Sequence, residues 1–168
     1  MNREQTLRRR IKRLTWLFII GLALSGATAI PLVTELGWLA QVFGVSSTTW
    51  IPWNDGIRGW IWEVWNSLQE TNTQYPFLFY GTDWLAFGHF VIAIVFFGAL
   101  RDPVRNRWLF DFGLIACALV IPYALVFGGL RGIPIWWRLI DCSFGVFGFI
   151  PLWFCRKWTS ELEQRVKS

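Results

Sequence analysis

The chain has 168 residues, of which 54% are hydrophobic and only 16% are charged, whereas soluble domains carry about 25% charged residues. Thirteen Trp and fifteen Phe stand against three Tyr, an unusual aromatic load for a surface in water. This composition excludes a disordered chain, a collagen-like repeat and a disulfide-stapled mini-domain, and it disfavours a soluble globular protein. We therefore expect an integral membrane protein.

Four apolar segments are each close to the roughly 20 residues that a helix needs to cross a hydrocarbon core about 30 Å thick. They cover residues 14–33, 80–100, 108–128 and 134–155. Asp102 and Pro103 are expected to open the third helix, as its N-cap and a proline in its first turn. Short links favour neighbours that run in opposite directions. The sequence therefore predicts an all-α fold, a four-helix transmembrane bundle with antiparallel helices.

The sixteen Lys and Arg are segregated along the chain: six precede the first segment, three lie in the link at 101–107 and four follow the last segment. With four spans, the two tails and the link at 101–107 lie on the same side of the membrane. Because Lys and Arg resist translocation, that side is the cytoplasm. We therefore expect residues 1–13 and 156–168 to be basic cytoplasmic tails, in a bacterial inner (plasma) membrane whose lipid is the first partner. Nucleic acid is not expected as a partner, because the cations follow the topology rather than one face.

The first segment has an alternative interpretation as a cleaved signal peptide. Basic residues precede it, and Ala27-Thr28-Ala29 matches a small-residue cleavage site. However, its apolar run is about 20 residues long, whereas signal cores usually have about 7–15 residues. We therefore expect this segment to be retained as a transmembrane helix.

Residues 34–79 form one long connection, which we expect on the extracytoplasmic side. Apolar residues recur at helical spacing between Asn54 and Glu70, where Asn54 or Asp55 could cap a helix, and a shorter stretch runs from Glu35 to Phe43. The connection holds six tryptophans, namely Trp38, Trp50, Trp53, Trp60, Trp62 and Trp65. Because indole rings favour the headgroup level, both helices are expected to lie flat in the membrane interface. This Trp-rich loop is expected to anchor and cover the bundle; the alternative is a lid or a docking surface.

Ionisable residues inside a span need a partner, a water pocket or a function, because each costs about 2.5–3.5 kcal/mol at the bilayer centre. Counting along the helices at about 1.5 Å per residue places four of them in the outer half of the bundle: Asp83, His89, Arg138 and Asp141. Arg131 and Tyr123 are expected to join this cluster, and the spacing of Arg138 and Asp141 lets them pair. The cluster is expected to pin the helices together; the alternatives are a ligand or substrate site and a proton or ion path.

Other features have ordinary structural explanations. Asp111 lies one turn beyond Arg107, so an ion pair within one helix is expected. Small residues that permit close helix contact, within the chain or between copies, occur at two places: Gly21, Ser25 and Ala29 in the first segment, and Gly145 and Gly148 in the last.

The chain has few side chains that could bind a metal or cofactor. His89 is the single histidine, so one chain cannot hold a bis-histidine haem. Cys117, Cys142 and Cys155 have no C-x-x-C spacing and fall at different levels or on different helices. We therefore predict no metal, no cofactor and no catalytic residue.

Four stretches in the second half of the chain carry a resemblance: Asp83-Trp84, Arg101-Asp102-Pro103-Val104-Arg105-Asn106, Arg131-Gly132-Ile133-Pro134 and Trp137-Arg138-Leu139-Ile140-Asp141. In these stretches the chain resembles small uncharacterised bacterial multi-pass membrane proteins. The resemblance implies a membrane protein and carries no site residue with it.

The functional hypothesis is a non-catalytic membrane protein, an accessory or assembly subunit that contacts another membrane protein, lipid or a second copy of itself. The smooth helix faces and the Trp-rich loop favour it. The alternative is an intramembrane enzyme or small-molecule carrier that uses the buried Asp/His/Arg cluster.

Overall fold

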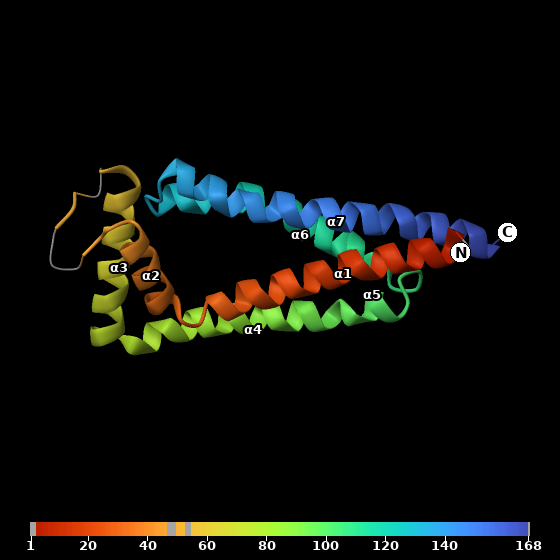
Figure 1. The fold of residues 1–168 in the computed structure, drawn as a ribbon, viewed down its shortest axis with the longest axis horizontal. Coiled ribbons are helices and arrows are strands. Elements are labelled where there is room, and N and C mark those ends of the chain that lie inside the picture. Colours follow the sequence, from red (N-terminus) through yellow and green to blue (C-terminus); the bar gives the residue numbers. More distant parts are fainter. Residues whose placement is uncertain (1–2, 47–49, 53–54, 168) are drawn as a thin grey trace. The chain divides into compact units, whose positions relative to one another are not determined.

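The computed structural model describes residues 3–46, 50–52 and 55–167, and every element in these ranges is helical. Figure 1 shows their order along the chain. The elements are α1 (Arg3–Thr28), α2 (Leu32–Val42), α3 (Gly56–Gln74), the 3-10 helix η1 (Pro76–Phe79), α4 (Tyr80–Val95), α5 (Phe97–Arg101), α6 (Arg107–Leu130) and α7 (Ile135–Lys167).

Four helical stretches are long and apolar enough to cross a membrane: Arg3–Thr28, Pro76–Arg101, Arg107–Leu130 and Ile135–Arg165. They carry large exposed apolar side chains, such as Leu17 (60% exposed), Ile94 (64%) and Leu139 (57%). In water such surfaces would favour aggregation, whereas in lipid they are solvated, and a helix satisfies its own backbone hydrogen bonds there. The structure is therefore consistent with an integral membrane protein.

The helices differ from the predicted segments at their ends. The first helix stops at Thr28 rather than at residue 33, because Pro31 has no amide hydrogen to continue the ladder and instead precedes α2. Both expected tails are largely helical, since α1 begins at Arg3 and α7 runs to Lys167. Within these extensions Leu7, Ile11 and Leu162 are fully buried, so an apolar stripe continues the helices beyond the apolar segments.

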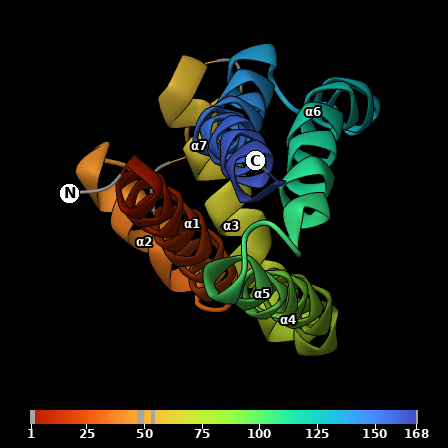
Figure 2. The ribbon, with the colours of Figure 1, turned by 90° about the vertical axis from the view of Figure 1, so that its right-hand side faces the viewer.

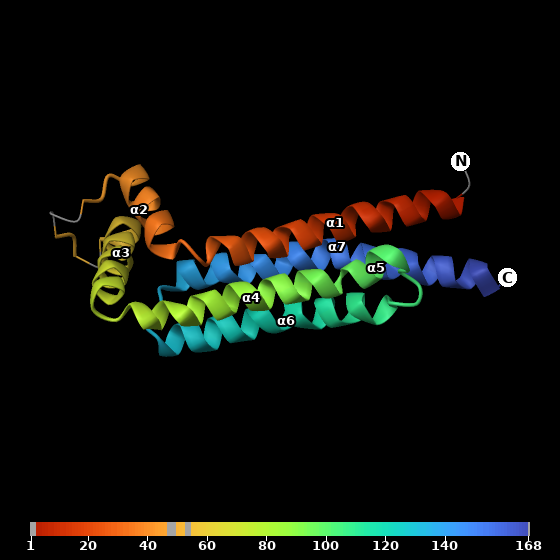
Figure 3. The same ribbon diagram turned by 90° about the horizontal axis from the view of Figure 1, so that it is seen from below.

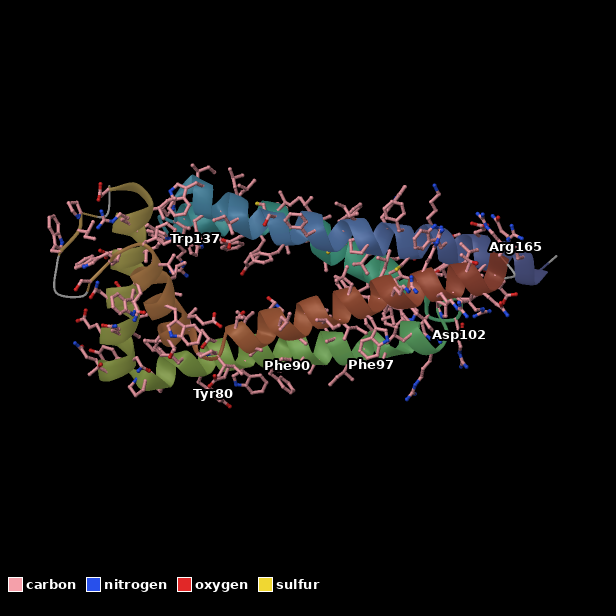
Figure 4. All side chains as sticks on the ribbon, in the orientation of Figure 1. Tyr80, Phe90, Phe97, Asp102, Trp137 and Arg165 are labelled. Atoms are coloured by element: carbon pink, nitrogen blue, oxygen red, sulfur yellow. The ribbon has the colours of Figure 1, made fainter. Side chains whose placement is uncertain are left out.

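The expected N-cap at Asp102 is wrong. Asp102 ends α5, and its carboxylate accepts hydrogen bonds from the backbone amides of Val104 (3.1 Å) and Arg105 (3.0 Å). This is an Asx-type turn, in which the carboxylate satisfies loop amides instead of the first amides of a helix. The helix α6 begins only at Arg107, and Figure 4 shows Asp102 in the loop between α5 and α6.

The chain divides into two compact units, residues 1–21 with 92–168 and residues 22–91. In the first unit, α6 and α7 pack along their length (Figure 2). A methyl group on Gly145 would lie 2.5 Å from the Cys117 carbonyl oxygen, and one on Gly113 would lie 2.7 Å from Leu152 Cδ1. Later residues of α7 therefore meet earlier residues of α6, so the two helices run in opposite directions along a seam that needs glycine. The glycine patch expected at 145 and 148 lies on this seam.

In the second unit, α2 and α3 pack together (Figure 3) around the buried residues Ala40, Val45, Ile51 and Ile61. Both helices match stretches expected to be helical, and a methyl group on Gly37 would lie 3.3 Å from the Trp65 Nε1. The expected cap Asn54 and the loop residue Trp53 lie outside the described residues. Asp55 occupies the N-cap position of α3 without a side-chain cap hydrogen bond. That these helices lie flat in the interface stays a prediction.

Close packing of α1 in the second unit uses a different small residue from those expected. A methyl group on Gly26 would lie 2.9 Å from His89 Cβ and 3.0 Å from the Ala86 carbonyl oxygen. Ser25 is exposed, and a methyl group on Gly21 would meet nothing within 4 Å. A role for the Gly21 stripe in contacts between copies stays a prediction.

Candidate functional site

A groove of about 640 Å³ lies on the α6–α7 pair. Its wall is mostly apolar, from Ala116, Leu119, Val120, Tyr123, Ala124, Phe127, Gly128 and Ile133. Two charged residues also line it, Arg131 and Asp141. The structure therefore brings together, on one surface of the first unit, two residues of the predicted cluster and the tyrosine expected beside them.

Asp141 is the polar residue in this groove that needs an explanation. It lies on α7, within a helix long enough to span a membrane, and is partly buried. Among the described residues, its carboxylate has no ion pair or hydrogen bond. An unpaired carboxylate at such a position is costly in lipid and marks a place where a partner, water or ligand is needed.

Arg138 is held by α6 rather than by Asp141. Its Cγ and Cδ lie 2.6 Å from where a Gly128 side chain would begin, so the arginine crosses α6 at the glycine pair Gly128 and Gly129. The Arg138 Nη1 donates a hydrogen bond of 3.1 Å to the Leu125 carbonyl, while its buried Nε has no partner. No ion pair joins Arg138 and Asp141 in the described part of the chain. Arg138 of α7 thus links the two helices, through its hydrogen bond and its packing against α6. We call this arrangement the Arg138 clamp.

Asp83 and His89 both lie on α4 in the second unit. Asp83 is exposed in the first turn of the helix. His89 is partly buried against Gly26, and its Nδ1 donates a hydrogen bond of 2.8 Å to the Leu85 carbonyl one turn earlier. Asp83 and His89 belong to one unit, whereas Arg138 and Asp141 belong to the other. A single cluster of all four residues therefore stays a prediction.

Ion pairs between helices replace the expected pair within α6. Asp111 accepts a hydrogen bond from Arg156 of α7, and Arg107 reaches Glu163 of α7 at 2.7 Å. The expected Arg107–Asp111 pair is therefore wrong: spacing allows it, but each residue has a partner on the neighbouring helix. Arg3 of α1 meets Glu161 of α7 at 3.1 Å, and Figure 4 shows side-chain nitrogen and oxygen atoms gathered around Arg165.

The cysteines serve packing in this structure. Cys117, Cys142 and Cys155 are buried and unpaired with one another. Cys142 Sγ lies 3.8 Å from the Ile121 carbonyl, and Cys155 Sγ lies 3.7 Å from the Ile11 carbonyl, so both thiols face the backbone of a neighbouring helix. Within the described ranges, no three side chains of His, Cys, Asp or Glu are placed to hold a metal ion. The absence of a cofactor stays a prediction.

The tryptophans of the long connection are divided between core and surface. Trp62 and Trp65 pack against the core of α2 and α3. Trp38 and Trp50 are 64% and 70% exposed. The exposed pair could contact lipid headgroups or a partner, so both interpretations of this loop stay open.

No protein-family model matches the chain, and neither a curated protein nor a solved structure is significantly similar to it. The functional argument therefore depends on the geometry of the groove and of the helices.

Proposed function

We propose that this chain is an antiparallel four-helix membrane bundle with both termini in the cytoplasm of a bacterial cell and the Trp-rich residues 34–79 outside. The segregation of Lys and Arg supports this orientation, because basic flanks stay on the cytoplasmic side. The Arg3–Glu161 pair supports a common side for the ends of α1 and α7. The plasma membrane is the proposed location.

A cysteine-labelling experiment tests the orientation. The exposed positions Gln5 and Asn72 lie on α1 and α3, and the native cysteines are buried. We expect Asn72→Cys to react with an impermeant maleimide in intact spheroplasts, and Gln5→Cys to react only after permeabilisation. The opposite pattern, or labelling of both from outside, would contradict the proposed topology.

Within this bundle we propose a non-catalytic role, as an accessory or assembly subunit that contacts another membrane protein. The observation that carries the proposal is the unpaired Asp141 carboxylate in an apolar groove on a helix long enough to span a membrane. A membrane helix from a partner would fill such a groove with its apolar side chains. A donor or cation on that helix would pair with Asp141 and remove the cost of its isolation.

The experiment compares co-purification of wild-type and variant chains in mild detergent. Asp141→Leu is expected to weaken partner binding about 5- to 30-fold and to lower partner recovery accordingly, because the loss of one buried polar contact costs about 1–2 kcal/mol. The melting temperature of the free chain should hold or rise, since the variant buries no unpaired charge. Asp83→Leu is the matched control, because Asp83 is exposed in the other unit. A strictly monomeric wild type, or full partner recovery by Asp141→Leu, contradicts the proposal.

The groove also supports a second candidate, a small-molecule carrier or intramembrane enzyme. Its volume of about 640 Å³ falls within the range of about 300–1,000 Å³ usual for ligand sites, and Asp141 would bind a cationic or hydrogen-bonding group. Phenotype and partner recovery together separate the two candidates. Loss of a transport or enzymatic phenotype in Asp141→Ala, with partner recovery intact and normal amounts of folded protein, would favour the second candidate.

A further inference from the structure

Most cations near the ends of α1 and α7 already have partners in the protein. Ion pairs engage Arg3, Arg8, Arg107, Arg156 and Arg165, and tryptophan rings engage Arg10 and Lys157. Lys12 and Arg13 differ from these residues. Both are exposed, and in the part of the chain that the structure describes neither has an ion pair, a hydrogen bond or a ring contact.

Lys12 and Arg13 line a shallow groove of about 530 Å³ on α1. The other lining residues are Arg9, Trp16, Leu17 and Ile20. These six positions recur at helical spacing, so they form one continuous face. The cations occupy the end of the face nearer the N-terminus, and large apolar side chains occupy the other end. We call this surface the α1 face.

The apolar end of the α1 face is open. Leu17 is 60% exposed and Ile20 is 50% exposed. Trp16 is 45% exposed, and its ring makes a T-shaped contact with Phe97 at a centroid distance of 5.4 Å, which holds the indole at the boundary between the cations and the apolar residues. Indole rings favour the headgroup level of a membrane.

We propose that the α1 face binds an anionic phospholipid, with the headgroup phosphate at Lys12 and Arg13 and an acyl chain along Leu17 and Ile20. Charge complementarity and the succession from cationic to apolar side chains carry this assignment. Anionic lipids make the cytoplasmic surface of a membrane negative, and basic segments beside a span are attracted to them. The inference rests on the membrane orientation proposed above and does not use the Asp141 groove.

The test is a titration of the full-length chain in detergent with pyrene-labelled phosphatidylglycerol, followed by energy transfer from tryptophan. Pyrene-labelled phosphatidylcholine is the zwitterionic probe. The variant Lys12→Gln/Arg13→Gln removes two positive charges from the α1 face. The variant Arg101→Gln/Arg105→Gln removes two from exposed positions in the α5–α6 region, so the net charge changes equally.

We expect the wild type to prefer phosphatidylglycerol. Because each basic residue beside a bound anionic headgroup strengthens attraction about fivefold, Lys12→Gln/Arg13→Gln should weaken its binding about 25-fold. The control variant should change it less than about twofold, because Arg101 and Arg105 do not line the α1 face. Leu17→Gln should also weaken binding of the lipid probe, because an acyl chain would lose its apolar contact.

Three results would overturn the assignment: equal weakening in both double variants, equal affinity for the two lipids, or displacement of the probe by millimolar inorganic phosphate. Equal weakening would indicate a bulk charge effect, and displacement would indicate a site for free phosphate. Partner recovery by Lys12→Gln/Arg13→Gln reports separately on the proposed function. If Lys12→Gln/Arg13→Gln loses the lipid preference but still recovers the partner, the lipid site is confirmed independently of the proposed function. If it keeps the lipid preference but loses the partner, the lipid site is contradicted.

Discussion

Replacing Gly145 with alanine is expected to destabilise the α6–α7 pair by about 1–3 kcal/mol, although alanine is the better helix former. The added Cβ would lie 2.5 Å from the Cys117 carbonyl oxygen and 3.4 Å from Val120 Cβ. A backbone oxygen cannot rotate away, so α6 and α7 must separate along the seam. The separation would also loosen the packing beside Gly148, where an added methyl group would lie 2.8 Å from Cys117 Sγ. Thermal unfolding in detergent, followed by tryptophan fluorescence, measures the effect.

The matched control is Gly21→Ala, which makes the same chemical change in another spanning-length helix. Its Cβ would meet nothing within 4 Å, so stability should hold or rise by about 0.5–1 kcal/mol, as expected when a helical glycine becomes alanine. If Gly21→Ala were as destabilising as Gly145→Ala, the stripe of small residues expected in the first segment would be a packing surface after all. If both variants were neutral, the glycine seam would be wrong.

The helices long and apolar enough to span a membrane were largely predictable, because an apolar run of about 20 residues is a strong signal for a membrane solvent. The segment expected at 108–128 corresponds closely to α6, Arg107–Leu130. The helix ends were less predictable. Leu7 and Ile11 stand in a sequence dominated by arginines, so their burial in α1 depends on neighbours distant in the chain. The Asp102 carboxylate accepts hydrogen bonds from the amides two and three residues later, as an N-cap would, but residues 103–106 form a turn and α6 begins only at Arg107.

The candidate site was predictable in part. Counting helical rise placed Asp141 in the outer half of the bundle, Arg131 was expected to join it there, and both residues line one groove. The position of Arg138 could not be predicted from the three-residue spacing, because spacing permits a pair without excluding a better partner. Arg138 instead donates to the Leu125 carbonyl and lies across Gly128 and Gly129. In the sequence these glycines indicate only the end of a helix. The partner of Asp111 could not be predicted for the same reason, because Arg156 lies 45 residues away in sequence.

The clamp formed by Arg138 predicts a strong coupling between two positions. Gly128→Ala is expected to cost about 1–3 kcal/mol, because the new Cβ would lie 2.6 Å from Arg138 Cγ and Cδ and would displace the arginine from the Leu125 carbonyl. In an Arg138→Ala background the same methyl group has space, so the double variant should be more stable than the sum of the single effects by about 1–2 kcal/mol. Arg131→Ala in place of Arg138→Ala is the control and should add within about 0.5 kcal/mol, because Arg131 is exposed. Chemical unfolding of the four combinations in detergent measures this coupling, and strict additivity of Gly128→Ala with Arg138→Ala would show that Arg138 does not lie across the glycine pair.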